Sequence, residues 1–146
     1  MEENNSAVFV DSNYFIALGN PDDRLHSHAL NITDLLDDGN VLVVISNLIF
    51  IEIVTVLSQR VGREIAWKVG RDLVEDPNVQ IIHIDPEVQE ESWEIFQKVA
   101  QKDISFVDCS TIAVMQSEGI DTLLTFDDDF QRLKKQFRFK LWDGKK

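Results

Sequence analysis

Short apolar segments alternate with longer amphipathic ones along the chain, and this alternation restricts the fold more than any other feature. The clearest apolar segment is Val41 to Ile45, a continuous run with β-branched residues that is typical of a parallel strand covered on both faces. Similar runs at 7–10, 79–84 and 122–124 predict further strands, with a last one at 137–141. Strands that alternate with helices indicate an α/β domain with a mostly parallel sheet.

Apolar residues at helical spacing fill the segments between these strands, and turn residues bound them. Ser12 is expected to cap the first helix, and the second is expected to turn Leu25, Ala29, Ile32, Leu35 and Leu36 inward. Helices are predicted over 12–18, 22–37, 47–59, 62–74, from Pro86 onward, 107–118 and 128–135.

The chain has 146 residues and 44% hydrophobic content, which fits a single domain over residues 1–146. Its polar and acidic first six residues predict neither a signal peptide nor a membrane anchor. The stretch from Val41 to Gln59 is apolar, but polar residues interrupt it, so we interpret it as a buried strand and helix. A single cysteine, Cys109, excludes an intrachain disulfide and favours a cytoplasmic location.

The net charge of −12 argues against a general nucleic-acid coat protein. The charge is unevenly distributed, because seven of the 14 Lys and Arg residues lie from Arg132 onward. This asymmetry permits local contact with a polyanion. The alternative is that the basic residues belong to an ordinary solvated helix and strand.

Two acids stand where acids are unexpected. Asp11 directly follows the first predicted strand, at a position that suits a metal ligand or, alternatively, a helix-capping aspartate. Glu52 lies between Ile51 and Ile53 in an apolar helix, so we expect it to be partly buried. A buried carboxylate without a partner is costly, which leaves a bound cation, a hydrogen-bond network or a salt bridge to an arginine as interpretations.

Further acids occur in the stretch from Ser105 to Phe130. Asp108 stands three residues after Ser105, which matches a capping box, and its carboxylate is also placed to face the strand ends. The triplet Asp127, Asp128 and Asp129 follows a short strand, and Thr125 with Asp128 resembles a second capping box. We therefore expect Asp128 to be structural, Asp127 to be the first candidate ligand and Asp129 the second. The alternative is an acidic, solvated helix start.

In parallel α/β sheets, sites form beyond the carboxyl ends of the strands, where the strand order reverses. We therefore predict that these acids meet there and bind Mg²⁺ or Mn²⁺, which prefer hard carboxylate oxygens. Such ions can activate water and stabilise charge on a phosphodiester. The predicted ligands are Asp11, Glu52, Asp108, Asp127 and Asp129, and all but the last are also assigned as catalytic.

The order of these motifs resembles the PIN-domain family, especially the small ribonuclease toxins of the VapC type. The resemblance rests on Asp11 after the first strand, Glu52 on the helix after the second, Asp108 opening a later helix, and the closing stretch Thr125-Phe-Asp127-Asp-Asp-Phe130. It implies a three-layer α/β/α sandwich, Mg²⁺- or Mn²⁺-dependent endoribonuclease activity, a homodimer and a small protein antitoxin whose segment covers the acidic site. It also implies that Ser12 or Asn13, and Ser46 or Thr125, support the acids through hydrogen bonds.

Other functions remain as alternatives. The chain could be a catalytically inactive PIN-like interaction or RNA-binding module that keeps the acids for folding or partner contact. A phosphoryl-accepting receiver domain lacks support, because no second acid accompanies Asp11 and no lysine lies between Thr125 and Phe130. His26 and His28 have metal-like spacing but lack further ligands, and Cys109 has no evident histidine partner. Arg132, Lys134, Lys135 and Arg138 are candidates to guide an RNA backbone.

Overall fold

A five-stranded parallel sheet forms the centre of the molecule in the computed structural model, which describes residues 6–144. The prediction that the first six residues are neither a signal nor an anchor falls almost wholly on residues 1–5, outside the described residues. The strands lie in the order β3-β2-β1-β4-β5, and each neighbouring pair is parallel. Their bounds are β1 (Ala7–Val10), β2 (Leu42–Ser46), β3 (Val79–Ile82), β4 (Thr122–Leu124) and β5 (Lys140–Leu141).

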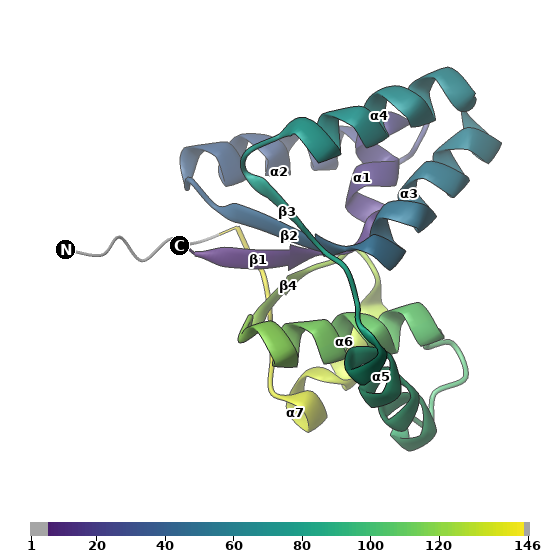
Figure 1. Cartoon of the computed structure of the whole chain (residues 1–146). Helices are drawn as coiled ribbons and strands as arrows, with labels where there is room; N and C mark the ends of the chain where they lie inside the picture. Colours follow the sequence, from purple (N-terminus) through teal and green to yellow (C-terminus); the bar gives the residue numbers. More distant parts are fainter. Residues whose placement is uncertain (1–5, 145–146) are drawn as a thin grey trace.

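Helices cover both faces of this sheet, which confirms the predicted three-layer sandwich. Figure 1 shows α1 to α4 on one face and α5, α6 and α7 on the other. The helices are α1 (Ser12–Gly19), α2 (His26–Asp38), α3 (Asn47–Arg60), α4 (Arg63–Glu75), α5 (Pro86–Lys98), α6 (Phe106–Glu118) and α7 (Lys134–Phe137), with a 3-10 helix η1 (Asp128–Arg132).

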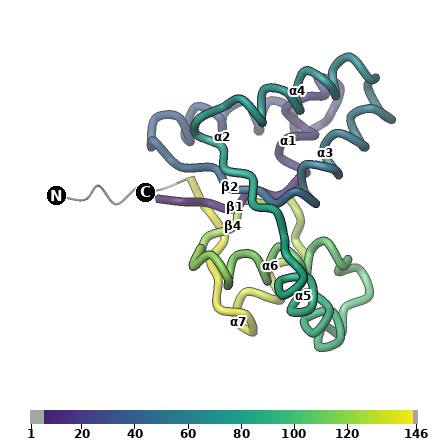
Figure 2. Tube along the Cα trace, viewed as in Figure 1, coloured from purple at the N-terminus to yellow at the C-terminus, as the bar shows by residue number. Residues whose placement is uncertain are grey.

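The central strand β1 is where the chain changes direction across the sheet. Its Phe9 pairs with Val44 of β2 on one side and with Leu123 of β4 on the other. From β1 the chain first builds outward through β2 and β3, then crosses back to add β4 and β5, as the trace in Figure 2 shows. The carboxyl ends of β1 and β4 therefore lie side by side at the point where ligands bind in open α/β sheets.

The core forms where the sheet meets the two helical layers. Phe9 and Ile45 from the strands, Ile53 from α3 and Ile112 from α6 are all fully or almost fully buried. Parallel strands covered on both faces require such continuous apolar sequences, which is why the Val41 to Ile45 run identified β2. The core thus fixes the strand ends that carry the acids.

The second helix begins four residues later than predicted. Two Asx turns replace the first turn of the expected helix. Asn20 Oδ1 accepts the Asp22 N–H at 3.1 Å, and Asp23 Oδ1 accepts the Leu25 N–H at 2.8 Å. Such side-chain bonds compete with helical hydrogen bonds. The prediction that Leu35 points inward is also wrong, since its side chain is 46% exposed.

The C-terminal region differs most from its predicted elements. The helix expected over 128–135 is divided into η1 and α7, and the strand expected from Phe137 is only the two-residue β5. Phe137 instead ends α7, and Arg138 takes a left-handed conformation with φ 60° before the chain enters β5. That break in the backbone shortens the strand.

No helix between residues 6 and 144 combines the length and the apolar character needed to cross a membrane. The apolar stretch from Val41 to Gln59 is β2 followed by α3, as predicted.

Candidate active site

Asp11 lies at the carboxyl end of the central strand. Its N–H donates to Leu124 O at 2.9 Å, which continues the pairing of β1 with β4 by one step. The Asp11 side chain caps α1 by accepting the Ser12 N–H at 2.8 Å, and it is only 5% exposed. Asp11 is therefore the capping residue, and the prediction that Ser12 caps this helix is wrong. The cap fixes one carboxylate oxygen of Asp11.

Thr125 links Asp11 to the loop that follows β4. Its Oγ1 donates to Asp11 Oδ2 at 2.8 Å and accepts the Asp127 N–H at 3.1 Å. Asn13 completes the junction, because its Nδ2 donates to Thr125 Oγ1 at 3.2 Å and its Oδ1 accepts the Phe126 N–H at 3.1 Å. The side chains of Thr125 and Asn13 each donate and accept hydrogen bonds. They therefore hold the start of α1 and the loop after β4 in one arrangement.

Glu52 projects from the first half of α3 and is half-buried, as predicted. Ser12 Oγ donates to Glu52 Oε1 at 2.5 Å. Among residues 6–144 no lysine or arginine nitrogen lies within ion-pair distance of Glu52, so the salt bridge considered for it does not form. Ser46 caps the same helix through the Ile49 N–H, and within residues 6–144 its side chain makes no hydrogen bond to an acid, whereas Ser12 does.

Asp108 forms the predicted capping box at the start of α6. Its Oδ2 accepts the Ser105 N–H at 3.0 Å, and the Asp108 N–H donates to Ser105 Oγ at 3.1 Å. The second carboxylate oxygen, Oδ1, has no hydrogen bond within the described part of the chain. Asp108 is thus held by its helix while one oxygen stays available, as the sequence indicated.

The triplet after β4 divides its roles differently from the prediction. Asp127, not Asp128, is the helix-capping member, and its Oδ1 accepts the Asp129 N–H at 2.9 Å. The capping box expected between Thr125 and Asp128 does not form, because Thr125 Oγ1 bonds to Asp127 instead. Asp128 is exposed, and Asp129 lies 3.9 Å from a nitrogen of Arg132.

Burial sets the ionisation of Asp11. Desolvation raises the pKa of Asp11 to about 7, although the hydrogen bonds from Thr125 and Ser12 oppose the shift. The negative charges of Asp108 and Glu52 also contribute to this raised pKa. A carboxylate that is difficult to ionise at neutral pH, with other acids around it, is typical of functional sites.

Asp108 shows the same pattern. Its pKa is raised chiefly by desolvation, and the charges of Asp127 and Glu52 add to the shift, while Ser105 opposes it. Four carboxylates that arise far apart in the sequence therefore lie in one electrostatic neighbourhood: Asp11, Glu52, Asp108 and Asp127. Asp129 joins its outer edge, since partial desolvation and then the Asp127 charge raise the pKa of Asp129.

The four carboxylates do not close around a single point. Between residues 6 and 144, no three Asp, Glu, His or Cys side chains form a ready-made ligand set. The donor chemistry nevertheless fits a hard divalent cation, because all four groups are carboxylates. Neighbouring negative charges contribute to the raised pKa values of Asp11 and Asp108, and a bound cation would offset these charges. In the described chain none of the four is paired with a lysine or arginine that would supply the opposite charge.

The remaining candidates take structural positions. His26 Nδ1 lies 2.8 Å from Ala17 O, and the ring of His28 lies 5.4 Å from that of Phe126. Cys109 is buried, and burial raises the pKa of its thiol to about 11. Sequence reasoning overlooked Asp103, whose charge raises the pKa of Asp129. The only feature of the sequence that could have indicated Asp103 is its position two residues before Ser105, the N-cap of α6.

Comparison with known proteins identifies the family of this fold. The model of the PIN domain family matches residues 8–136. The 23S rRNA-specific endonuclease VapC20 of Mycobacterium tuberculosis is 31% identical over 123 residues, which span 84% of this chain and 91% of that protein. The crystal structure of the M. tuberculosis VapC20, described as a sarcin-ricin loop cleaving toxin, superposes with a TM-score of 0.76 at 29% identity, covering 86% of this chain and 94% of that one.

More distant structures share the fold. VapBC2 from Rickettsia felis, bound to a DNA fragment from its promoter, gives a TM-score of 0.69 at 18% identity and covers 94% of this chain and 99% of that one. FitAcB from Neisseria gonorrhoeae gives 0.65 at 15% identity, with coverage of 94% and 97%. The match over most of the sequence, together with the relative above 30% identity, establishes that the chain belongs to the PIN-domain family, as a VapC-type member.

Proposed function

We propose that this protein is a metal-dependent endoribonuclease that hydrolyses RNA phosphodiester bonds, and that it acts as the toxin of a toxin–antitoxin pair. The observation that carries the proposal is the position of the buried Asp11 at the strand switch point, with the carboxylates of Asp108 and Glu52 near enough to raise its pKa. The identity with an rRNA-specific endonuclease supports RNA as the substrate.

We assign Mg²⁺ or Mn²⁺ as the cofactor, held by Asp11, Glu52, Asp108 and Asp127. When bound, such an ion supplies an activated water and stabilises charge on the phosphodiester. We assign Asp127 rather than Asp129 for two reasons. The charge of Asp127 raises the pKa of Asp108, which places Asp127 near the other acids. Asp129 instead lies 3.9 Å from a nitrogen of Arg132.

The protein's own contribution is to fix these carboxylates before substrate arrives. Asp11 is held by its helix cap and by Thr125, and Asp108 by its capping box. Ser12 orients Glu52 from the neighbouring helix. Rigid placement of charged groups reduces the reorganisation that the reaction would otherwise require.

A protein antitoxin is the partner we propose. A groove of about 680 Å³ lies between α1, α2 and α4, with apolar walls that include Phe15, Leu36 and Val69. Asp37 and Asp76 add negative charge to its lining, where Lys68 pairs with Asp72. A groove of this size between helices suits the apolar face of a partner helix that carries basic residues. The structural similarity to VapBC2 and FitAcB is consistent with such a partner.

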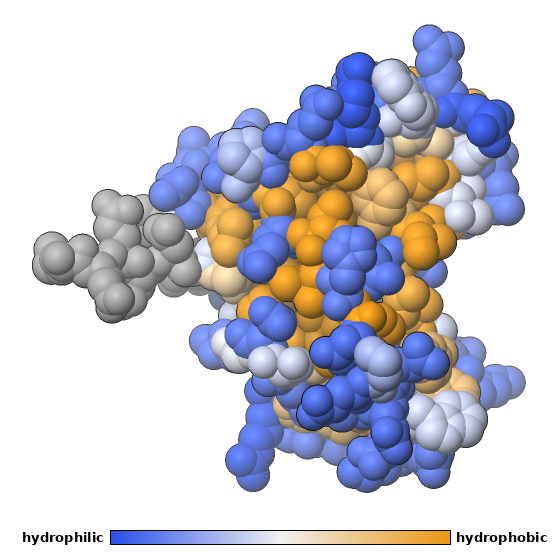
Figure 3. Space-filling view, viewed as in Figure 1, coloured by the Kyte–Doolittle hydropathy of each residue, from blue (hydrophilic) through white to orange (hydrophobic). Residues whose placement is uncertain are grey.

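We also propose a homodimer. β3 is an edge strand, and an apolar hollow beside it is lined by residues such as Phe50, Val74 and Ile81. Figure 3 shows that apolar atoms gather in the middle of this face. Unpaired edges with apolar surroundings are normally covered. Val74→Glu should therefore reduce the molar mass measured by light scattering, whereas Val69→Glu, in the other groove, should weaken only antitoxin binding.

The decisive experiment compares cleavage of defined RNAs in Mg²⁺ or Mn²⁺ by the wild type and three variants. Asp11→Asn and Asp108→Asn should lose cleavage by at least about 100-fold, as expected when a metal ligand is removed. Asp128→Asn serves as the matched control, because Asp128 is an exposed member of the same acidic triplet. If both site variants cleave RNA as fast as the wild type, the chain is not a metal-dependent ribonuclease of this design.

A further inference from the structure

One outward face of α4 combines an exposed tryptophan with arginines. Arg63, Trp67 and Arg71 recur every four residues, so they lie along the same side of the helix. The Trp67 side chain is 64% exposed, and the Arg71 guanidinium carbon lies 4.6 Å from the centre of its ring. The contact holds a flat aromatic surface and a cation side by side at the protein surface.

Two exposed acids, Glu64 and Glu75, also lie on α4, four residues after Arg60 and Arg71 respectively. The arginines nevertheless form no close ion pair with them. Within residues 6–144, the guanidinium groups of Arg60, Arg63 and Arg71 make no ion pair with a carboxylate. On the same helix Lys68 does, with Asp72 at 3.0 Å. Among the described residues, three arginines without a close ion pair therefore stand within twelve residues, in a chain with a net charge of −12. Their position favours an anionic partner.

The face is connected to the acidic site through α3. Glu52 and Arg60 lie eight residues apart on this helix, which corresponds to about 12 Å along its axis. Between them, Thr55 and Gln59 are exposed, as is Ile51 next to Glu52, so the exposed side of α3 leads from the site to the arginines. Figure 1 shows α3 rising from the end of β2 to the tip that joins α4.

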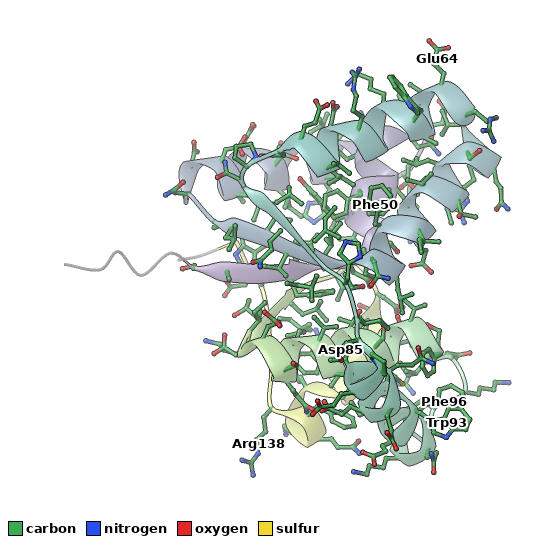
Figure 4. All side chains as sticks on the ribbon, viewed as in Figure 1. Phe50, Glu64, Asp85, Trp93, Phe96 and Arg138 are labelled. Carbon is green, nitrogen blue, oxygen red and sulfur yellow. The ribbon has the colours of Figure 1, made fainter. Side chains whose placement is uncertain are left out.

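Trp93 and Phe96 lie on the opposite helical layer, far from the Glu64 end of α4 in Figure 4.

We propose that Arg60, Arg63, Trp67 and Arg71 form a binding track for the substrate RNA, which begins about 12 Å along α3 from Glu52. The arginines contact phosphates, and Trp67 stacks against one unpaired base. This inference rests on the proposed ribonuclease function and extends it to the recognition of the strand. It explains how an acidic protein binds a polyanion, because binding depends on local positive charge and aromatic stacking rather than on net charge.

Binding is measured separately from cleavage to test the track. The dissociation constant of a fluorescein-labelled single-stranded RNA of about 12 nucleotides is determined by anisotropy in EDTA. Trp67→Ala should raise it about tenfold, within the range for loss of one base–aromatic stack. Trp67→Phe should restore most of the affinity.

Salt dependence identifies the phosphate contacts. The double variant Arg63→Ala/Arg71→Ala should lower the slope of log affinity against log salt by about 1.4, because each single-strand phosphate contact contributes about 0.7. Two control variants should bind RNA with the affinity and salt dependence of the wild type. Trp93→Ala removes a tryptophan that is 54% exposed on α5, and Lys68→Ala removes a paired cation from α4.

The outcomes separate this inference from the proposed function. If the wild type cleaves RNA but Trp67→Ala and the arginine variant bind it within twofold of wild type, the track is wrong and the ribonuclease assignment stands. If Trp67→Ala weakens binding but the wild type never cleaves, the track stands and the ribonuclease assignment fails. If Trp67→Ala instead changes the oligomeric state and leaves RNA affinity unchanged, the face belongs to a second copy, which also overturns the track.

Discussion

Thr125 Oγ1 donates a hydrogen bond of 2.8 Å to Asp11 Oδ2, although the two residues lie 114 positions apart in the sequence. The bond exists because β1 and β4 are adjacent and end at the same level of the sheet. The same hydroxyl accepts the Asp127 N–H, so one small side chain positions two of the four acids. Removal of this hydroxyl therefore removes one hydrogen bond from Asp11 and one from Asp127.

Thr125→Val should destabilise the protein by about 1–3 kcal/mol, since a nearly isosteric side chain removes a donor and an acceptor from a partly buried network. It should also raise the pKa of Asp11 further, because the Thr125 hydrogen bond lowers it. The measurements are urea unfolding at pH 8 and the pH dependence of RNA cleavage, whose acid limb should move to higher pH. Thr125→Ser retains the hydroxyl and should behave like the wild type, and equal effects of both variants would refute the hydrogen-bond role.

The metal-free protein should lose stability as the pH rises from about 4 to about 7. The pKa of Asp11 is about 7 in the folded protein and near 3.8 when unfolded, so across this interval the folded state retains a proton that the unfolded state releases. The cost reaches at most about 4 kcal/mol and is constant above pH 7. Asp11→Asn should lack this part of the pH dependence when unfolding is followed in EDTA. A wild type and variant with parallel stability curves would contradict the assignment.

Cys109 should be inert in the folded protein. It is fully buried, and burial raises the pKa of its thiol to about 11, so almost no thiolate is present at pH 8. A thiol reagent such as Ellman's reagent should therefore react only after the addition of denaturant. Rapid modification of the native protein would show that the core around α6 opens.

The fold was predictable because its strands are buried on both faces. Continuous apolar runs such as Val41 to Ile45 identified most strands, and the alternation with helices identified the layers. The errors occur where local hydrogen bonds or tertiary context decide the backbone. Asn20 and Asp23 delay α2 through side-chain turns, and the left-handed Arg138 shortens the last strand.

The sequence indicated the candidate acids one by one, but not the hydrogen-bond network that holds them. Glu52 was conspicuous because it is flanked by isoleucines, and Asp108 because it completes a capping box with Ser105. The capping role belongs to Asp127 instead of Asp128, because both stand near Thr125 and sequence spacing cannot show which of them the hydroxyl contacts. That choice depends on the short loop after β4, which is set by the pairing of β1 with β4.

Metal binding should identify the fourth acid of the site. Mn²⁺ or Mg²⁺ should raise the melting temperature of the wild type more at pH 8 than at pH 5, because bound carboxylates must be deprotonated. Glu52→Gln and Asp127→Asn should each reduce this shift by half or more. Asp129→Asn should reduce it little, because Asp129 lies 3.9 Å from Arg132 at the edge of the cluster. A loss with Asp129→Asn but not with Asp127→Asn would transfer the ligand role to Asp129, and an unchanged melting temperature in the wild type would contradict the metal assignment itself.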